Sequence, residues 1–161
     1  MIRKTLFFLA IIFFLVSPYM RASSIKQVKF SDIQEVMNKD NDTIYVIHFW
    51  ATWCAPCIDE LPEIEAFSNQ HSNEHVNTLL ISLDFESQVE SKLIPFLQQH
   101  DIQSEVWLLD SKNANDWIPK VNKQWSGAIP VTLITQNHKE HFINGETSKE
   151  ELNQIIKTKF K

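Results

Sequence analysis

β-Branched and aromatic residues dominate positions 43–50, so an extended chain there would be apolar on both faces. A strand of this kind is typical of the centre of a parallel sheet that helices cover on both sides. After Cys54 the apolar residues return at three- and four-residue spacing, which predicts a helix that ends near Gln70. Pro62 lies inside this helix, where it removes one backbone hydrogen bond and is expected to bend the axis. The pattern therefore indicates a buried strand that leads directly into a helix.

The rest of the chain alternates between short apolar runs and helical spacing. Further strands are expected at residues 76–83, 106–109, 131–135 and 141–144. Further helices are expected within residues 25–42, 93–100, 113–124 and 146–161. Ser31 and Gln34 have capping-box spacing in the first of these helices, Thr147 or Ser148 would cap the last, and residues 137–140 form a turn. Alternating strands and helices followed by a hairpin predict an α/β fold, with a mixed central sheet flanked by helices.

Residues 1–22 have the layout of a secretory signal peptide, with a basic start, an apolar stretch and a helix-breaking Ser-Pro before small residues. The apolar stretch, residues 6–16, is shorter than the ~20 residues that span a bilayer. An uncleaved N-terminal anchor is the alternative, because Met20 is large for a position so near the cleavage site. Residues 23–161 are expected to form one domain outside the cytoplasm, where disulfides form and persist.

The chain is acidic, with 20 acidic and 15 basic residues and a formal net charge of −5 when its histidines are neutral. This balance argues against nucleic acid or an anionic membrane surface as a partner. No metal site is expected, because the pairs His71 with His75 and His138 with His141 lie in polar segments without a third ligand.

Cys54 and Cys57 are the two cysteines of the whole chain. A secreted domain that used disulfides for stability would carry more cysteines, spaced further apart, and a loop this short adds little chain-entropy stabilisation. Cys54 is expected where the strand ends and the helix begins, so free backbone N–H groups and the helix dipole would favour its thiolate. Pro56 suits the first helical turn, because its missing N–H would have had no partner there. The pair therefore predicts thiol–disulfide exchange, with a purely structural bridge as the alternative.

The segment FWATWCAPC at residues 49–57 is followed by Glu-Leu-Pro at residues 60–62 and by Ile-Pro at residues 129–130. These motifs resemble the thioredoxin superfamily and, more narrowly, the TlpA/ResA-like thiol–disulfide oxidoreductases of bacterial envelopes. The resemblance covers essentially all of residues 23–161. It implies a thioredoxin fold in which residues 84–110 supply an extra helix and strand.

The resemblance also assigns roles around the cysteines. Cys54 would be the attacking thiol and Cys57 the resolving thiol. Trp53 would border the site, and Ala55 and Pro56 would lie against the substrate and help to set the reduction potential.

Pro130 would form a cis peptide bond beside the disulfide, and the backbone of Ile129 would pair with an extended substrate segment. An ordinary trans proline is the alternative for Pro130. Glu60 lies three residues after Cys57 on the same helix face, where a carboxylate could relay the proton of that thiol. A solvated glutamate that favours the helix dipole is the alternative for Glu60.

His48 departs from the aspartate or asparagine that these relatives carry at the corresponding strand position. An imidazole under the active-site helix could act as a proton relay for the cysteines. The alternative is a core histidine with one backbone partner.

The expected function is that of an extracytoplasmic thiol–disulfide oxidoreductase that needs no cofactor beyond its own redox-active disulfide. The resemblance implies a reductant of disulfides in envelope proteins such as apocytochrome c, recharged by a membrane thiol electron donor. The protein is expected to be a monomer. An oxidant or isomerase of secreted proteins remains open. So does a thioredoxin-fold binding module in which the cysteines are incidental.

Overall fold

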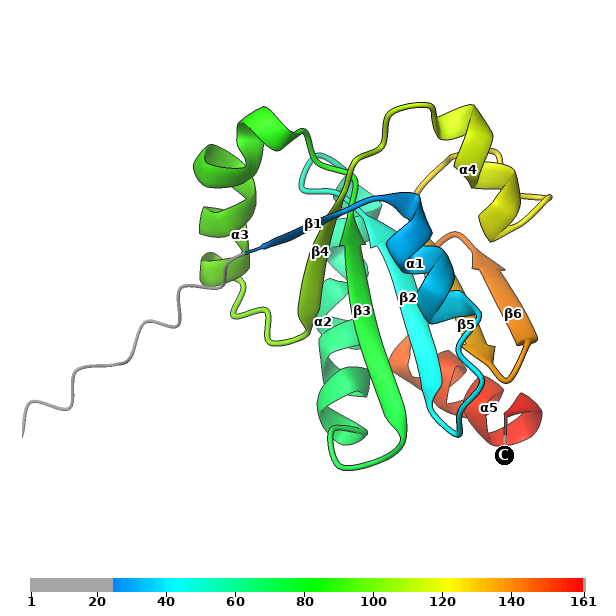
Figure 1. The fold of residues 1–161 in the computed structure, drawn as a ribbon. Coiled ribbons are helices and arrows are strands. Elements are labelled where there is room, and N and C mark those ends of the chain that lie inside the picture. The colour runs from blue at the N-terminus through cyan, green and yellow to red at the C-terminus, as the bar shows by residue number, and fades with distance from the viewer. Residues whose placement is uncertain (1–24, 161) are drawn as a thin grey trace, which may run out of the picture.

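The structure, a computed structural model, describes residues 25–160, and the proposed signal peptide or anchor lies outside the described residues. Six strands form one sheet in the order β1-β4-β3-β2-β5-β6 (Figure 1). The strands are β1 (Lys26–Val28), β2 (Ile44–Trp50), β3 (Val76–Ser82), β4 (Glu105–Leu109), β5 (Val131–Gln136) and β6 (Lys139–Asn144). The first four strands are mutually parallel, whereas β5 and β6 run antiparallel to their neighbours. The predicted α/β fold with a mixed sheet is confirmed.

Helices cover both faces of the sheet (Figure 1). They are α1 (Phe30–Met37), α2 (Ala55–Gln70), α3 (Ile94–Gln99), α4 (Ala114–Val121) and α5 (Lys149–Lys159). A 3₁₀ turn, η1 (Glu86–Gln88), and a π-helical turn, η2 (Val89–Leu93), lead into α3. One apolar cluster joins α2, α3 and α5 to one face, and a second cluster joins α1 and α4 to the other. The expected extra helix and strand at residues 84–110 are present as α3 and β4.

Strand β2 lies at the centre of the sheet, between β3 and β5, and all seven of its residues are buried. Successive side chains of a strand point to opposite faces. The even-numbered residues of β2, His48 among them, therefore face α2 and α5, whereas the odd-numbered ones face α1 and α4. This alternation places an imidazole directly beneath the helix that carries both cysteines.

The beginning of the domain differs from the expectation in two ways. Lys26–Val28 is a strand rather than part of a helix, and it pairs in parallel with the edge of β4. The predicted capping box at Ser31 is also wrong, because α1 begins after Lys29, whose backbone N–H donates to the Asp32 carboxylate at 2.7 Å. Three residues are too few to show a period of two, so only the available edge of β4 makes this segment a strand.

The hairpin between β5 and β6 is tighter than predicted. Its turn contains only Asn137 and His138, with φ of 48° and 64°, and Gln136 pairs directly with Lys139. Positive φ at both central residues is the signature of a type I′ turn, which matches the twist of the flanking strands. Residues 139 and 140 therefore belong to the last strand. At the start of α5 the cap is Ser148, whose hydroxyl accepts from the backbone N–H of residue 151.

Candidate active site

The two cysteines form a disulfide at the amino end of α2. Cys54 is the N-cap residue, reached from β2 through a three-residue loop, and its sulfur accepts a hydrogen bond from the Cys57 backbone N–H at 3.3 Å. The Sγ atoms are 2.06 Å apart and the Cα atoms 5.2 Å apart. Cys57 is fully buried, whereas Cys54 keeps 7% of its surface exposed. An incoming sulfur can therefore reach Cys54 but not Cys57.

The loop before β5 lies against the disulfide. The Ile129–Pro130 peptide bond is cis, and the carbonyl oxygen of Ile129 lies 3.6 Å from Cys54 Sγ. Pro130 is buried, and Ile129 is partly exposed. Two segments 75 residues apart in the sequence thus meet at one sulfur atom.

Exposed side chains surround this contact. Trp53 is 56% exposed immediately before the disulfide, and both Ala55 and Pro56 are exposed on the first turn of α2. These residues are therefore accessible to a polypeptide that approaches Cys54.

The loop between β2 and α2 is tied down by a residue that the sequence analysis did not identify. Asp84, which follows β3, is 2% exposed and accepts hydrogen bonds from the Thr52 backbone N–H at 3.1 Å and from the Thr52 hydroxyl. The Ser82 hydroxyl donates to the same carboxylate at 2.8 Å. An acidic residue directly after a buried strand is the signal that could have indicated it, because parallel neighbouring strands end at the same edge of the sheet.

His48 and Glu60 meet beneath the active-site helix. His48 is fully buried, and its Nδ1 lies 2.9 Å from the hydroxyl of Thr132 on β5. Its Nε2 lies 3.4 Å from Oε1 of Glu60, which is 5% exposed. The other oxygen of Glu60 accepts from the backbone N–H of Thr147 at 2.7 Å. The solvated interpretation of Glu60 is therefore wrong, and His48 is the expected core histidine but contacts side chains rather than a backbone group.

Burial moves both groups toward their neutral forms. It lowers the pKa of His48 from 6.5 to about 3. It raises the pKa of Glu60 from 4.5 to about 7; Glu146 adds to this increase, and the hydrogen bond from Thr147 opposes it. Near neutral pH the imidazole is therefore uncharged, and the carboxyl group is near the midpoint of its titration.

The protonation of Glu60 decides which nitrogen of His48 carries the proton. Among the described residues, neither His48 Nε2 nor Glu60 Oε1 has a hydrogen-bond partner, although the two atoms face each other. When Glu60 is protonated, its O–H can donate to Nε2 while Nδ1–H donates to Thr132. When Glu60 is ionised, Nε2–H can donate to the carboxylate, and Nδ1 accepts from the Thr132 hydroxyl. The neutral imidazole thus accommodates either state of the carboxyl group.

The fold and this disulfide site are similar to those of thioredoxin-fold thiol–disulfide oxidoreductases. The sequence model of the AhpC/TSA family matches residues 19–140, and the chain belongs to that family. Over the residues that the structure describes, no helix is long and apolar enough to cross a membrane.

Two relatives have names that refer to thiol–disulfide chemistry or to thioredoxin. The Bacillus subtilis sporulation thiol-disulfide oxidoreductase A is 31% identical over 87 residues, which are 54% of this chain and 50% of that protein. The chain therefore spans half the length of this relative. Thioredoxin 1 of Nostoc is 29% identical over 108 residues, 67% of this chain and 87% of that protein.

Solved structures agree on the fold. The thioredoxin-related protein from Neisseria meningitidis serogroup B superposes with a TM-score of 0.62 at 22% identity, covering 74% of this chain and 84% of that one. StoA from Bacillus subtilis superposes with a TM-score of 0.56 at 19% identity, covering 71% and 83%. These likenesses support the thioredoxin fold independently of the site residues.

Proposed function

We propose that this protein works outside the cytoplasm as a reductant, and that its Cys54 thiolate attacks disulfides of envelope proteins. The observation that carries the proposal is the position of the Cys54 sulfur, at the start of α2 and 3.6 Å from the Ile129 carbonyl oxygen. A thiolate is stabilised at a helix N-terminus, and an exposed backbone beside it can pair with an extended substrate. The resemblance to TlpA/ResA-like proteins favours the reducing direction.

The reaction begins with the reduced pair. The Cys54 thiolate attacks one sulfur of a substrate disulfide, so a mixed disulfide forms and the second substrate sulfur leaves as a thiolate that takes up a proton. Cys57 then loses its proton and attacks Cys54 Sγ, which releases the first substrate sulfur as a thiol. The substrate gains two electrons, and the protein is left with the Cys54–Cys57 disulfide that the structure contains. A thiol donor at the membrane would restore the dithiol.

Glu60 is the proposed proton acceptor for Cys57. It lies one helical turn further along α2, and both side chains are buried. A general base works best when its pKa lies near the operating pH, and the pKa of Glu60 is raised to about 7. His48 would act as the proposed relay by adjusting its neutral tautomer to the state of the carboxyl group.

The N-terminal segment and two solved structures of the same fold support a place outside the cytoplasm. Residues 1–22 have the layout of a secretory signal peptide, with an N-terminal anchor as the alternative. Two structures of the same fold are described as secreted: a Mycobacterium tuberculosis disulfide oxidoreductase and a Corynebacterium glutamicum thiol-disulfide isomerase. Apocytochrome c is the first substrate to test, with the protein acting as a monomer. The isomerase among the structural relatives makes an oxidant or isomerase the second candidate.

The deciding experiment is the reduction potential of the Cys54–Cys57 couple, measured by equilibration of the full-length protein with thiol buffers. A potential near or below about −230 mV supports a reductant, whereas one between about −120 and −180 mV supports an oxidant or isomerase. No exchange at all would leave a binding module. Cys57→Ser is the matched variant, because it should accumulate a mixed disulfide through Cys54. Cys54→Ser should form none.

A further inference from the structure

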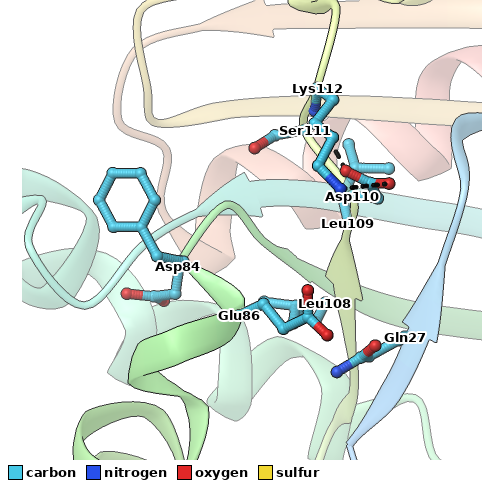
Figure 2. Close-up of a pocket in the computed structure, with 9 residues that line it drawn as sticks. Gln27, Asp84, Glu86, Leu108, Leu109, Asp110, Ser111 and Lys112 are labelled. Carbon is cyan, nitrogen blue, oxygen red and sulfur yellow. Dashed lines mark hydrogen bonds and ion pairs between the residues drawn. The ribbon is translucent and has the colours of Figure 1, made fainter.

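A pocket of about 300 Å³ lies at the carboxyl ends of three parallel strands, β1, β3 and β4. Gln27, residues 84–86 and residues 108–112 line it. Figure 2 shows Asp84 and Gln27 on opposite sides of the opening, with residues 110–112 at one end. Of these residues, only Asp84 has a place in the site described above, where it holds the loop before Cys54.

The topology explains why a pocket forms there. After β3 the chain continues to α3, which packs on the same face of the sheet as α2. After the neighbouring strand β4 it continues to α4, which packs on the opposite face. Adjacent parallel strands whose connections leave to opposite faces create a crevice, and open α/β sheets bind ligands at such a switch point.

The lining of the pocket combines an apolar floor with an acidic rim. Leu108 and Leu109 are buried beneath it, and the ring of Phe85 stands at its edge with 61% of the residue exposed. Three carboxylates line it against a single cation, Lys112, which already pairs with Asp110 at 3.6 Å. The carboxylate of Asp84 is buried and accepts hydrogen bonds from Thr52 and Ser82, so the exposed Glu86 supplies the negative charge that a ligand can approach. A side chain that fits this lining is apolar, with a cationic neighbour.

One residue of the pocket also holds the loop that carries the attacking cysteine. Asp84 lines the pocket and also holds Thr52, two residues before the attacking cysteine. Neighbouring strands lie about 4.8 Å apart, so β3 and β4 end roughly 5–10 Å from the end of β2 along the sheet edge. An extended polypeptide advances about 3.3 Å per residue and covers this distance in about two to three residues. Trp53 and Phe85 are the exposed large apolar residues among those described. Trp53 directly follows Thr52, and Phe85 directly follows Asp84, the hydrogen-bond partner of Thr52.

We propose that this pocket is a second binding site for the substrate polypeptide. It takes an apolar side chain that is adjacent to a lysine or arginine and lies about two to three residues from the reacting cysteine of the substrate. This inference rests on the proposed function, because it requires a polypeptide whose cysteine reaches Cys54.

The test uses the reduced full-length protein and synthetic peptides whose single cysteine carries 5-thio-2-nitrobenzoate in a disulfide. Attack of Cys54 on the peptide sulfur forms the mixed disulfide and expels the coloured thiolate, so absorbance gives the second-order rate. The peptides carry Leu-Lys, Ala-Lys or Leu-Glu three residues from the cysteine. The symmetric reagent 5,5′-dithiobis(2-nitrobenzoate) reports reactivity at Cys54 without a peptide.

The natural protein should react at least about fivefold faster with the Leu-Lys peptide than with the Ala-Lys peptide, and Phe85→Ala should remove this preference. The natural protein should also react about two- to fourfold faster with the Leu-Lys peptide than with the Leu-Glu peptide. Glu86→Lys should reverse this preference. Glu90→Lys, an exposed charge reversal outside the pocket, should behave as the natural protein does. Phe85→Ala changes no charge and should react with the anionic symmetric reagent at the rate of the natural protein.

Equal rates for all three peptides, with the symmetric reagent still reactive, would overturn the proposal. If Phe85→Ala at the same time increased protease cleavage within residues 1–24, the occupant would be the beginning of the chain itself, and the substrate assignment would be wrong. Loss of reactivity toward the symmetric reagent would instead count against the proposed thiol function, so the two failures are distinguishable.

Discussion

Replacing His48 with asparagine should change how the stability of the oxidised protein depends on pH. Burial lowers the pKa of His48 from 6.5 to about 3, so its contribution to stability is complete above pH 6.5 and falls as the pH drops below that value. Burial raises the pKa of Glu60 from 4.5 to about 7, so its contribution is complete below pH 4.5 and is lost as the pH rises toward 7. Between pH 4.5 and 6.5 the two groups therefore oppose each other.

Proton counting gives the size of the effect. In that window the unfolded pair is a carboxylate with an imidazolium, and the folded pair is a carboxylic acid with a neutral imidazole. Both pairs hold one proton, so together they contribute no pH dependence. Each uncompensated proton changes the free energy of unfolding by about 1.4 kcal/mol per pH unit. His48→Asn leaves Glu60 uncompensated, so stability should fall by about 3 kcal/mol from pH 4.5 to pH 6.5 relative to the natural protein.

Urea denaturation of the oxidised protein at pH 4.5, 5.5 and 6.5 measures this difference. Lost packing at the smaller side chain lowers the free energy of unfolding equally at each pH, so only the slope carries the information. Glu60→Gln is the matched control, because its amide can still accept from Thr147 while it leaves His48 uncompensated. Its stability should rise by about 3 kcal/mol over the same range. If His48→Asn and the natural protein gave parallel curves, the assigned charge states of the pair would be refuted.

Four substitutions test other parts of the structure, and Glu60→Gln serves here in a second assay. Glu60→Gln removes the proposed proton acceptor, so resolution of the mixed disulfide at pH 7 should slow by about 100-fold or more in stopped-flow assays, and a twofold change would exclude the role. Gly127 has φ of +91° and a Cβ there would lie 3.0 Å from Ile118, so Gly127→Ala should lower stability by about 2–3 kcal/mol. Gly145→Ala, with φ of +102° and nothing within 4 Å, should cost only about 1 kcal/mol in the same thermal melts, and equal losses would contradict the contact. Asp84→Ala leaves buried donors unpaired and should cost about 1–3 kcal/mol by urea denaturation, whereas an unchanged midpoint would show that the loop does not depend on it.

Local patterns in the sequence were sufficient for the main elements. Residues 43–50 are apolar on both faces, and such a strand is stable only when both faces are covered, so its central position followed from composition. The helix at Ala55–Gln70 followed from its spacing, with a proline in the first turn and Pro62 inside. Because both signals lie next to each other in the chain, the junction that holds the disulfide could be predicted without tertiary information.

The short strand and the hairpin register needed the tertiary structure. Lys26–Val28 has no recognisable pattern of its own and becomes a strand because the edge of β4 offers hydrogen bonds to it. The turn at Asn137 and His138 lacks glycine, so the strand pairing on either side, rather than turn composition, sets where it closes. The partner of the short strand is far away in the sequence, whereas the turn depends on the register between the two strands that flank it.

The surroundings of the disulfide were decided in the same way. Sequence spacing placed Glu60 near Cys57 and placed His48 on the strand that leads to the active-site helix. It did not decide whether Glu60 is a proton relay or a solvated carboxylate, or whether His48 is a proton relay or a core histidine. The fold places their side chains 3.4 Å apart and buries both, which excludes a solvated carboxylate and gives the histidine side-chain partners. Asp84 had no sequence signal beyond its place after a strand, yet it anchors the loop that carries the attacking cysteine. Residue types and local order thus come from the sequence, whereas these contacts depend on how strands far apart in the chain align at one edge of the sheet.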